Sequence, residues 1–228
     1  MKSFISEDNI EQAICNRLSL PEYGWKRIEC DARVDAQDDV STTGRANPSE
    51  CILPDVLFAA LKRLNPKMDE DVLKIILQDL RKDFTGTDMI DTNYSLYQKI
   101  RNGIKVPVRR NGKDDFGIVR LFDFDHPEMN DFHCVNQMWI KGHYRYRRPD
   151  VLLFVNGLPV VFIELKNSTV KIEEAYNKNL TSYRQDIPNI FAFNQICVLS
   201  NGLQTKIGAW NSKYEFFFEW LRVDDEKE

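Results

Sequence analysis

Two short apolar segments joined by a turn signal constrain the fold of this chain more than any other feature. Residues 151–155 (Val-Leu-Leu-Phe-Val) and 160–163 (Val-Val-Phe-Ile) are nearly continuous apolar runs. Such runs are typical of strands that are buried on both faces of a sheet. Asn156-Gly157 lies between them and is a strong signal for a β-hairpin. The segment therefore predicts a hairpin at the centre of a covered sheet.

The apolar pattern divides the rest of the chain into a helical first part and a strand-rich second part. Helical periodicity and capping residues predict three helices that begin near residues 6, 54 and 69, and a fourth that runs through residues 94–100 with Gly103 as its C-cap. Polar residues 31–48 predict a loop. Further strands are expected at 106–108, 116–124, 132–140, 195–199 and 205–210, with a helix over about 170–183. A helix between strands indicates a parallel pairing, so we expect an α/β fold with a central mixed sheet flanked by helices.

The length of 228 residues favours one compact domain that folds without a disulfide or metal. Within it, residues 1–103 are expected to form an N-terminal helical layer on a core made by residues 104–228. The five cysteines are scattered and form no C-x-x-C motif, which predicts reduced thiols. The chain shows neither a signal peptide nor a membrane-spanning apolar run, so we expect a cytoplasmic protein that does not contact a membrane.

Three charged residues end the two apolar strands. Asp150 precedes the first strand, while Glu164 and Lys166 end the second and share a face because they are two residues apart. The length of the turn decides whether Asp150 faces Glu164. A two-residue loop over 156–157 pairs Asp150 with the residue before Glu164, whereas a three-residue loop over 156–158 pairs the two acids directly. We favour the longer loop because it explains why charged groups terminate such apolar strands.

Two carboxylates opposed across a strand pair repel each other unless a cation lies between them. Carboxylate oxygens suit Mg²⁺, with Mn²⁺ as an alternative, better than zinc. Lys166 beside the cation can orient or deprotonate an attacking water, or neutralise charge on a phosphate. Hydrolysis of a phosphodiester requires these parts. The alternative is a solvated Glu164–Lys166 pair on an edge strand with Asp150 in a turn, which the preceding Pro149 and the fitting hairpin length disfavour.

A basic and aromatic segment, residues 141–148, comes immediately before Pro149-Asp150. The chain as a whole has 31 basic and 35 acidic residues, a balance that argues against a nucleic-acid binder. Cations beside the carboxylates nevertheless predict local contacts to phosphates. The predicted DNA-binding residues are Lys141, Tyr144, Arg145, Arg147 and Arg148. A second basic patch, Arg109, Arg110 and Lys113, is interpreted as a solvated turn.

Pro149-Asp150 followed by Glu164-Leu165-Lys166 resembles the signature of the PD-(D/E)-x-K nuclease superfamily. The residues around this signature are similar to the N-terminal endonuclease domain of type I restriction enzyme R subunits. The similarity is carried by residues 121–132, 135–137, 148–150, 156–159, 164–167 and 187–202. It covers essentially the whole chain, loosely before Tyr94 and tightly after it.

The resemblance implies a restriction-endonuclease-like core that cleaves double-stranded DNA with Mg²⁺. It implies that Asp150, Glu164 and the Leu165 carbonyl bind the metal and that Lys166 is catalytic. It also implies a longer protein, in which a C-terminal helicase-like motor uses ATP and methylase and specificity subunits are partners, in a bacterial or archaeal cytoplasm. The chain itself has no P-loop motif for ATP.

Three further residues are matched to the family by position. An acidic residue on the first helix faces the metal in this group, and Glu11 fits that place, although a plain interfacial glutamate is an open alternative. Asn179 and Tyr183 have the spacing of the related Q-x-x-x-Y element. Asparagine is one methylene shorter than glutamine, so it stays open whether the Asn179 amide reaches DNA or the catalytic loop. A plain packing role between helix and sheet also stays open for Tyr183.

Two other functions stay open from the sequence. The first is a freestanding nuclease that resembles RecB or the resolvases, which keeps the chemistry but has no motor or methylase partner. The second is a catalytically silent DNA-binding or assembly module. The complete set of Asp150, Glu164 and Lys166 argues against the silent module.

Overall fold

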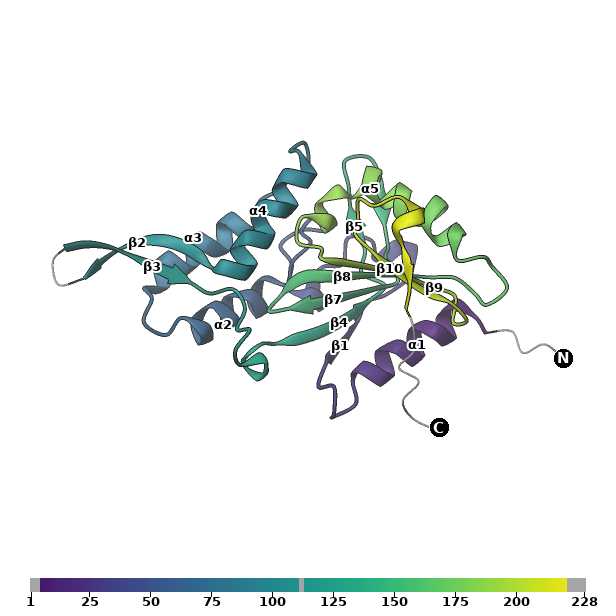
Figure 1. The fold of residues 1–228 in the computed structure, drawn as a ribbon, viewed down its shortest axis with the longest axis horizontal. Coiled ribbons are helices and arrows are strands. Elements are labelled where there is room, and N and C mark those ends of the chain that lie inside the picture. Colours follow the sequence, from purple (N-terminus) through teal and green to yellow (C-terminus); the bar gives the residue numbers. More distant parts are fainter. Residues whose placement is uncertain (1–4, 111–112, 221–228) are drawn as a thin grey trace.

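A central seven-stranded sheet organises the molecule (Figure 1). The structure is a computed structural model that describes residues 5–110 and 113–220. The strands, in spatial order, are β1 (Lys26–Glu29), β4 (Phe132–Asn136), β7 (Val151–Val155), β8 (Leu158–Leu165), β9 (Ile196–Ser200), β10 (Thr205–Gly208) and β11 (Phe218–Glu219). The β1–β4 and β8–β9 pairs are parallel and the other pairs are antiparallel. The predicted α/β fold with a mixed central sheet is therefore confirmed.

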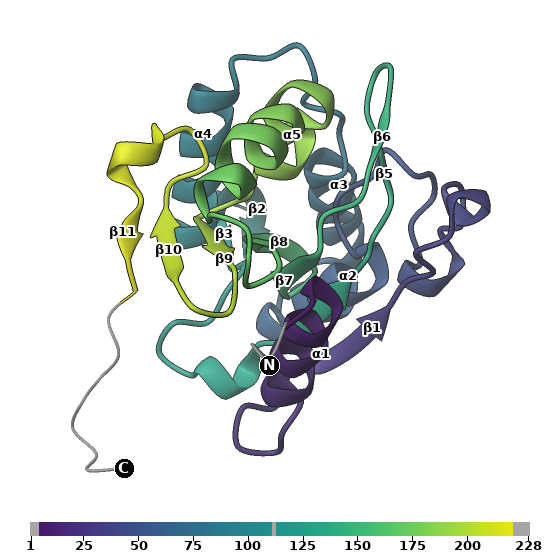
Figure 2. The same cartoon turned by 90° about the vertical axis from the view of Figure 1, so that its right-hand side faces the viewer.

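Helices cover both faces of this sheet, as the two perpendicular views show (Figures 1 and 2). The α-helices are α1 (Glu7–Leu18), α2 (Pro54–Leu64), α3 (Glu70–Leu80), α4 (Met89–Asn102) and α5 (Thr181–Asp186), and a π-helix over Ala175–Leu180 leads directly into α5. Short 3-10 turns lie at Val34–Ala36, Ser41–Thr43, Pro127–Met129, Pro188–Phe191 and Tyr214–Phe216. Helix α1 packs on one face of the sheet, and the π-helix with α5 packs on the other. No helix in the described ranges combines the length and the apolar character that crossing a membrane requires.

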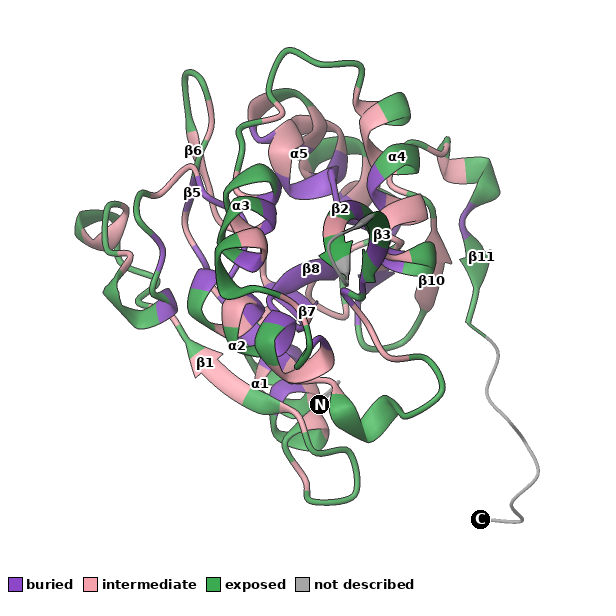
Figure 3. Ribbon diagram, turned by 90° about the vertical axis from the view of Figure 1, so that its left-hand side faces the viewer, coloured by how far each residue is buried: buried purple, intermediate pink, exposed green. Residues whose placement is uncertain are grey.

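The apolar core continues beyond the sheet into a second cluster that joins α2, α3 and α4. Figure 3 shows that buried residues concentrate on β7 and β8 and on the inward faces of the helices. Two ribbons stand apart from the main sheet, namely β2 (Ile104–Arg110) with β3 (Lys113–Val119), and β5 (Ile140–Lys141) with β6 (Tyr146–Arg147). The β2–β3 ribbon extends past the helical cluster at the left of Figure 1.

Several sequence-predicted elements differ from the structure. The first hundred residues are not all helical, because β1 joins the sheet as its edge strand next to β4. Its four residues carry one apolar side chain, Ile28, which explains why no strand pattern was visible. The strands expected at 106–108 and 116–124 form the separate β2–β3 ribbon, because Val106 and Val119 pack on the helical cluster rather than on the sheet.

The turn between β7 and β8 sets the register of the central hairpin. Val155 pairs with Leu158, so the loop is the two-residue Asn156-Gly157 turn and the predicted three-residue loop is wrong. Both turn residues have positive φ, +49° and +81°, as a type I′ turn requires. A β-bulge then shifts the register between Leu153 and Phe154, and Val151 pairs with Ile163. Continuing this register by one residue places Asp150 opposite Glu164. The two acids are therefore opposed as expected, but the bulge and not a longer loop brings them into register.

Candidate active site

The three predicted catalytic residues lie together where β7 begins and β8 ends. The Leu165 N–H donates a 2.7 Å hydrogen bond to Asp150 Oδ2, which fixes that carboxylate beside the end of β8. Lys166 Nζ lies 3.3 Å from Glu164 Oε1 and donates a 2.7 Å bond to the Leu165 carbonyl. Glu7 on α1 approaches the same ammonium group at 3.9 Å. Sequence reasoning missed Glu7, although its position four residues before Glu11 places both on one face of a helix.

Glu164 is the most deeply buried of these groups, with 1% of its surface exposed. Its Oε2 atom has no hydrogen-bond partner among the described residues. Burial raises the pKa of Glu164 well above its usual value, the nearby Asp150 raises it further, and Lys166 lowers it. Burial also raises the pKa of Asp150 to about 6, against the opposing effects of the Leu165 N–H and Lys166. The positive charge of Lys166 therefore does not balance the two carboxylates, Asp150 and Glu164, at this site.

This electrostatic cost predicts that Asp150→Asn stabilises the folded chain. The pKa of Asp150 is about 6 when folded against 3.8 as the ordinary value, so the folded state favours the protonated acid. Wild-type stability should fall as pH rises from 4 through 6, by at most about 3 kcal/mol. Asparagine keeps an oxygen acceptor for the Leu165 N–H and cannot ionise. The variant should therefore have the same free energy of unfolding as wild type below pH 4 and a higher one as the pH rises through 6. Urea unfolding with a chelator present at pH 4 to 8 measures this, and equal stability at pH 8 would contradict it.

Asn179 and Tyr183 both reach the site from the helix that follows β8. The Asn179 side-chain amide donates a hydrogen bond to Glu164 Oε1, so the shorter side chain does reach this carboxylate. Asn179 lies in the π-helix, whose wider turn inserts a residue and changes which side chains face the sheet. The Tyr183 hydroxyl donates to the Arg148 carbonyl at 3.1 Å, and its ring packs on Phe162 at 5.4 Å. Tyr183 thus combines packing with a polar contact.

Glu11 is 4% exposed on α1 and faces the same region. Its Oε1 accepts a 2.8 Å hydrogen bond from Asn136 Nδ2, and its Oε2 accepts one from the Gln137 side-chain amide. The charge of Glu11 contributes to the raised pKa of Asp150. Glu11 is therefore a polar neighbour of the site. Sequence reasoning gave no role to Asn136 and Gln137, which precede a loop and have no motif spacing.

A cleft of about 510 Å³ opens beside Asp150. Its acidic lining residues are Glu7, Asp8, Glu11, Glu29, Asp31 and Asp150, and Arg148 is the basic residue of the lining. Carboxylates concentrated in a cleft attract cations and repel phosphates. The chemistry of this surface therefore favours a metal ion over a direct contact with a DNA backbone.

The residues present fit a divalent metal such as Mg²⁺. No three His, Cys, Asp or Glu side chains converge closely enough to hold a metal by themselves in residues 5–110 and 113–220. Asp150, Glu164 and the Leu165 carbonyl nevertheless supply three oxygen donors, and Mg²⁺ commonly keeps several waters beside one or two carboxylates. The unpartnered Oε2 of Glu164 supports this fit, because a buried carboxylate oxygen without a donor is costly.

The predicted DNA-binding residues occupy two different environments. Arg147 Nε donates a 2.7 Å hydrogen bond to Asp186 within an ion pair, and Arg148 donates a 2.6 Å bond to the Ala32 carbonyl at the acidic cleft. Lys141, Tyr144 and Arg145 are exposed on the β5–β6 ribbon, with Tyr144 at 89%. The ribbon residues are thus free to meet a phosphate, while the two arginines nearest Asp150 are engaged within the protein. DNA binding by all five stays a prediction.

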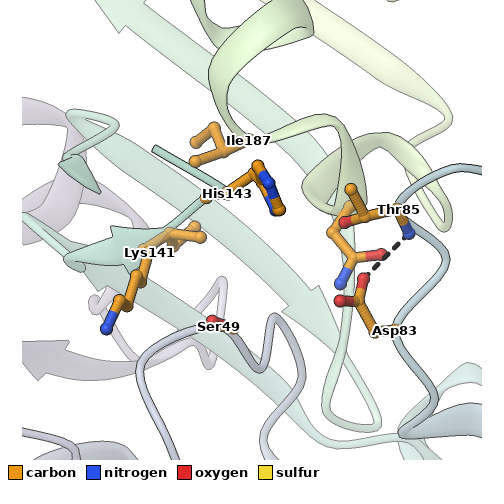
Figure 4. A pocket seen from close by; sticks show the side chains of 9 residues that line it. Ser49, Asp83, Thr85, Lys141, His143 and Ile187 are labelled. Carbon is orange, nitrogen blue, oxygen red and sulfur yellow. Dashed lines mark hydrogen bonds between the residues drawn. The ribbon is translucent and has the colours of Figure 1, made fainter. Parts of the chain in front are cut away.

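A second, smaller cavity of about 180 Å³ lies beside the β5–β6 ribbon and its turn (Figure 4). Lys141 and His143 line it from the ribbon, Asp83 and Thr85 line it from the segment after α3, and Ser49 lines it from the segment before α2. The Asp83 carboxylate accepts a 2.8 Å hydrogen bond from the Thr85 N–H. None of the predicted metal ligands lines this cavity, so it is separate from the carboxylate site.

Comparison with known proteins connects this site to one family. The family model described as "Type I restriction enzyme R protein N terminus" matches residues 4–216. The type I restriction enzyme HindI endonuclease subunit of Haemophilus influenzae is 30% identical over 226 residues, which are 97% of this chain and 21% of that protein. A Methanocaldococcus jannaschii protein, provisionally named the type I restriction enzyme MjaIXP endonuclease subunit, is 32% identical over 232 residues, with the same coverage. The chain thus spans about a fifth of the length of these relatives. It belongs to the family of type I restriction enzyme R protein N-terminal regions.

Proposed function

We propose that this chain is the DNA-cleaving module of a type I restriction enzyme and hydrolyses phosphodiester bonds with Mg²⁺. The observation that carries the proposal is the buried Glu164 carboxylate, whose second oxygen has no described hydrogen-bond partner, next to Asp150 and Lys166. Such an arrangement is unfavourable for folding and suited to metal-assisted hydrolysis. The relatives, which are named as endonuclease subunits, support the same activity.

Each residue at the site has a distinct part in this chemistry. Asp150, Glu164 and the Leu165 carbonyl would hold the divalent metal, which supplies Lewis-acid charge to the phosphate. Asn179 donates to Oε1 of Glu164 and thereby restrains this carboxylate. Lys166 presents its ammonium group between Glu164 and the Leu165 carbonyl, where it can orient the attacking water or stabilise negative charge on the phosphate.

The charge distribution fits a cutting module that other domains deliver to double-stranded DNA. The chain is acidic overall, with a net charge of −4, and the cleft beside Asp150 is lined mainly by carboxylates. The exposed cations of the β5–β6 ribbon supply a limited phosphate contact. We therefore propose that a helicase-like motor, which uses ATP, and methylase and specificity subunits hold this module on DNA in a bacterial or archaeal cytoplasm.

Plasmid cleavage by the assembled enzyme with Mg²⁺ and ATP tests the proposal. Asp150→Ala should lower the cleavage rate at least about a hundredfold, because it removes one metal ligand. ATP hydrolysis by the same preparation should continue, which shows that the assembly is intact. The matched control is Asp8→Asn, an exposed carboxylate of the same cleft, and it should cut like wild type. Normal cleavage by a folded Asp150→Ala enzyme would instead favour a catalytically silent module.

A further inference from the structure

The Glu11 carboxylate is held by two neutral donors. Asn136, the last residue of β4, donates from Nδ2 at 2.8 Å to one oxygen, and the Gln137 side-chain amide donates to the other. Glu11 itself is 4% exposed, so this carboxylate has little contact with solvent. Both of its oxygens are therefore fixed by side chains that carry no charge.

A second buried glutamate in the same molecule is compensated in a different way. Glu50 is 6% exposed, and its carboxylate accepts a 2.6 Å bond from Arg81 Nε within an ion pair. The fold thus supplies a cation where a buried carboxylate is structural. At Glu11 the two donors are amides, which satisfy the hydrogen bonds and leave the negative charge in place.

Both amides are tied to the backbone beside Asp150. Asn136 pairs with Val151 in the sheet, directly after Asp150. The Gln137 backbone N–H donates to the Asp150 carbonyl at 3.0 Å. Gln137 also has a φ of +60°, a conformation that residues other than glycine seldom adopt. The residue with this unfavourable backbone conformation is thus the one whose side-chain amide bonds to Glu11.

A further cost is present at Asn136. Its Oδ1 atom is buried and has no hydrogen-bond partner among the described residues. A buried amide oxygen without a donor destabilises the fold. An apolar residue at this position would avoid that cost, so the contact from Nδ2 to Glu11 is the evident benefit of an asparagine.

We propose that Asn136 and Gln137 are positioning residues that hold the Glu11 carboxylate, which forms no ion pair within residues 5–110 and 113–220, in the cleft that Asp150 also lines, and thereby increase the affinity of this cleft for a divalent cation. This inference rests on the proposed metal-dependent function and deepens it. The amides act through Glu11, whose carboxylate lines the same cleft as Asp150. Polar groups that orient the ligands of a metal commonly change its affinity by about 10- to 100-fold.

Binding of Mn²⁺ to the complete polypeptide without nucleotide, measured by calorimetry, tests this role. Gln137→Met should weaken the Mn²⁺ affinity about tenfold, and Asn136→Ser should do the same, because the serine hydroxyl is too short to replace the bond from Asn136 Nδ2 to Glu11. The Mg²⁺ concentration for half-maximal plasmid cleavage by the assembled enzyme should rise in parallel, while the rate at saturating Mg²⁺ stays near wild type. The control is Gln12→Met, because the Gln12 amide lies on the same cleft but bonds Arg27 at 2.8 Å.

A double-mutant cycle shows whether the amides act through Glu11. Glu11→Gln alone should weaken Mn²⁺ binding, and adding Gln137→Met to it should cause no further loss. The inference is overturned if Gln137→Met and Asn136→Ser bind Mn²⁺ like the Gln12→Met control, or if the two losses multiply. Asp150→Ala distinguishes a failure of this inference from a failure of the proposed function. If Asp150→Ala abolishes cleavage while the amide variants bind Mn²⁺ normally, the inference alone fails. If Asp150→Ala instead leaves Mn²⁺ binding and cleavage unchanged, the proposed function fails as well.

Discussion

Replacing Lys166 with methionine is expected to lower DNA cleavage by the assembled enzyme about 10³-fold at saturating Mg²⁺. Lys166 Nζ lies 3.3 Å from Glu164 Oε1 and 2.7 Å from the Leu165 carbonyl, so it is the cation nearest the proposed metal ligands. Methionine keeps the length of the side chain but can neither donate a hydrogen bond nor carry charge. The effect should appear in the maximal rate, because the oxygen ligands of the metal remain in place. Single-turnover nicking of a supercoiled plasmid measures it.

The control for this experiment is Lys171→Met. Lys171 is exposed in the segment between β8 and the π-helix, and its replacement removes the same charge from the chain without touching the site. Cleavage by that variant should equal wild type. If the Lys166→Met enzyme is folded, hydrolyses ATP and nicks DNA at the wild-type rate, then Lys166 has no catalytic role and the chemistry proposed here is wrong.

Replacing Gly157 with alanine should destabilise the chain by about 3 kcal/mol. A φ of +81° costs an alanine about 1–2 kcal/mol. An added Cβ would also lie 2.5 Å from the Leu53 carbonyl oxygen and 2.8 Å from the Leu57 nitrogen, so the first turn of α2 would have to move. Overpacking of this kind commonly costs another 1–3 kcal/mol. Urea unfolding of the 228-residue chain gives the difference directly.

Gly86→Ala is the matched control because it separates strain from steric contact. Gly86 has a similar φ of +89°, but no atom lies within 4 Å of an added Cβ. Its replacement should therefore cost about 1–2 kcal/mol, the conformational part alone. Equal losses in the two variants would show that the contact between Gly157 and α2 is unimportant. Because Gly157 closes the hairpin that carries Asp150 and Glu164, its variant should also cut DNA more slowly at temperatures near its unfolding midpoint.

Much of the fold could be predicted because its signals are local. The apolar runs at 151–155 and 160–163, the turn between them and the period of the α2 and α3 helices each depend on residues close in the chain. Gly103 ends α4 as expected, with a φ of +75° and its N–H bonded to the Lys99 carbonyl. Elements with weak local patterns were missed. Strand β1 exists because β4 supplies its hydrogen bonds, and the β2–β3 ribbon stands apart because its valines pack on the helices.

Some residues of the site could be predicted from the sequence and others could not. Asp150, Glu164 and Lys166 are tied by a short hairpin, so their proximity follows once the register is known. Asn136 ends strand β4 and Gln137 follows it, and these two residues are 125 and 126 positions away from Glu11 in the sequence. No spacing rule connects residues so far apart, and only the packing of α1 against β4 brings them together.

The sequence by itself determined that this chain has a buried hairpin with two acids and a lysine at its outer end. It did so because side-chain alternation and turn propensity act between near neighbours. The tertiary structure alone decided how these groups meet. A two-residue turn by itself would have placed Asp150 out of step with Glu164, and the bulge in β8 restored the pairing. The π-helix brought Asn179 to Glu164, and the packing of α1 brought Glu11 to the amides, because these contacts depend on long-range packing that no local pattern records.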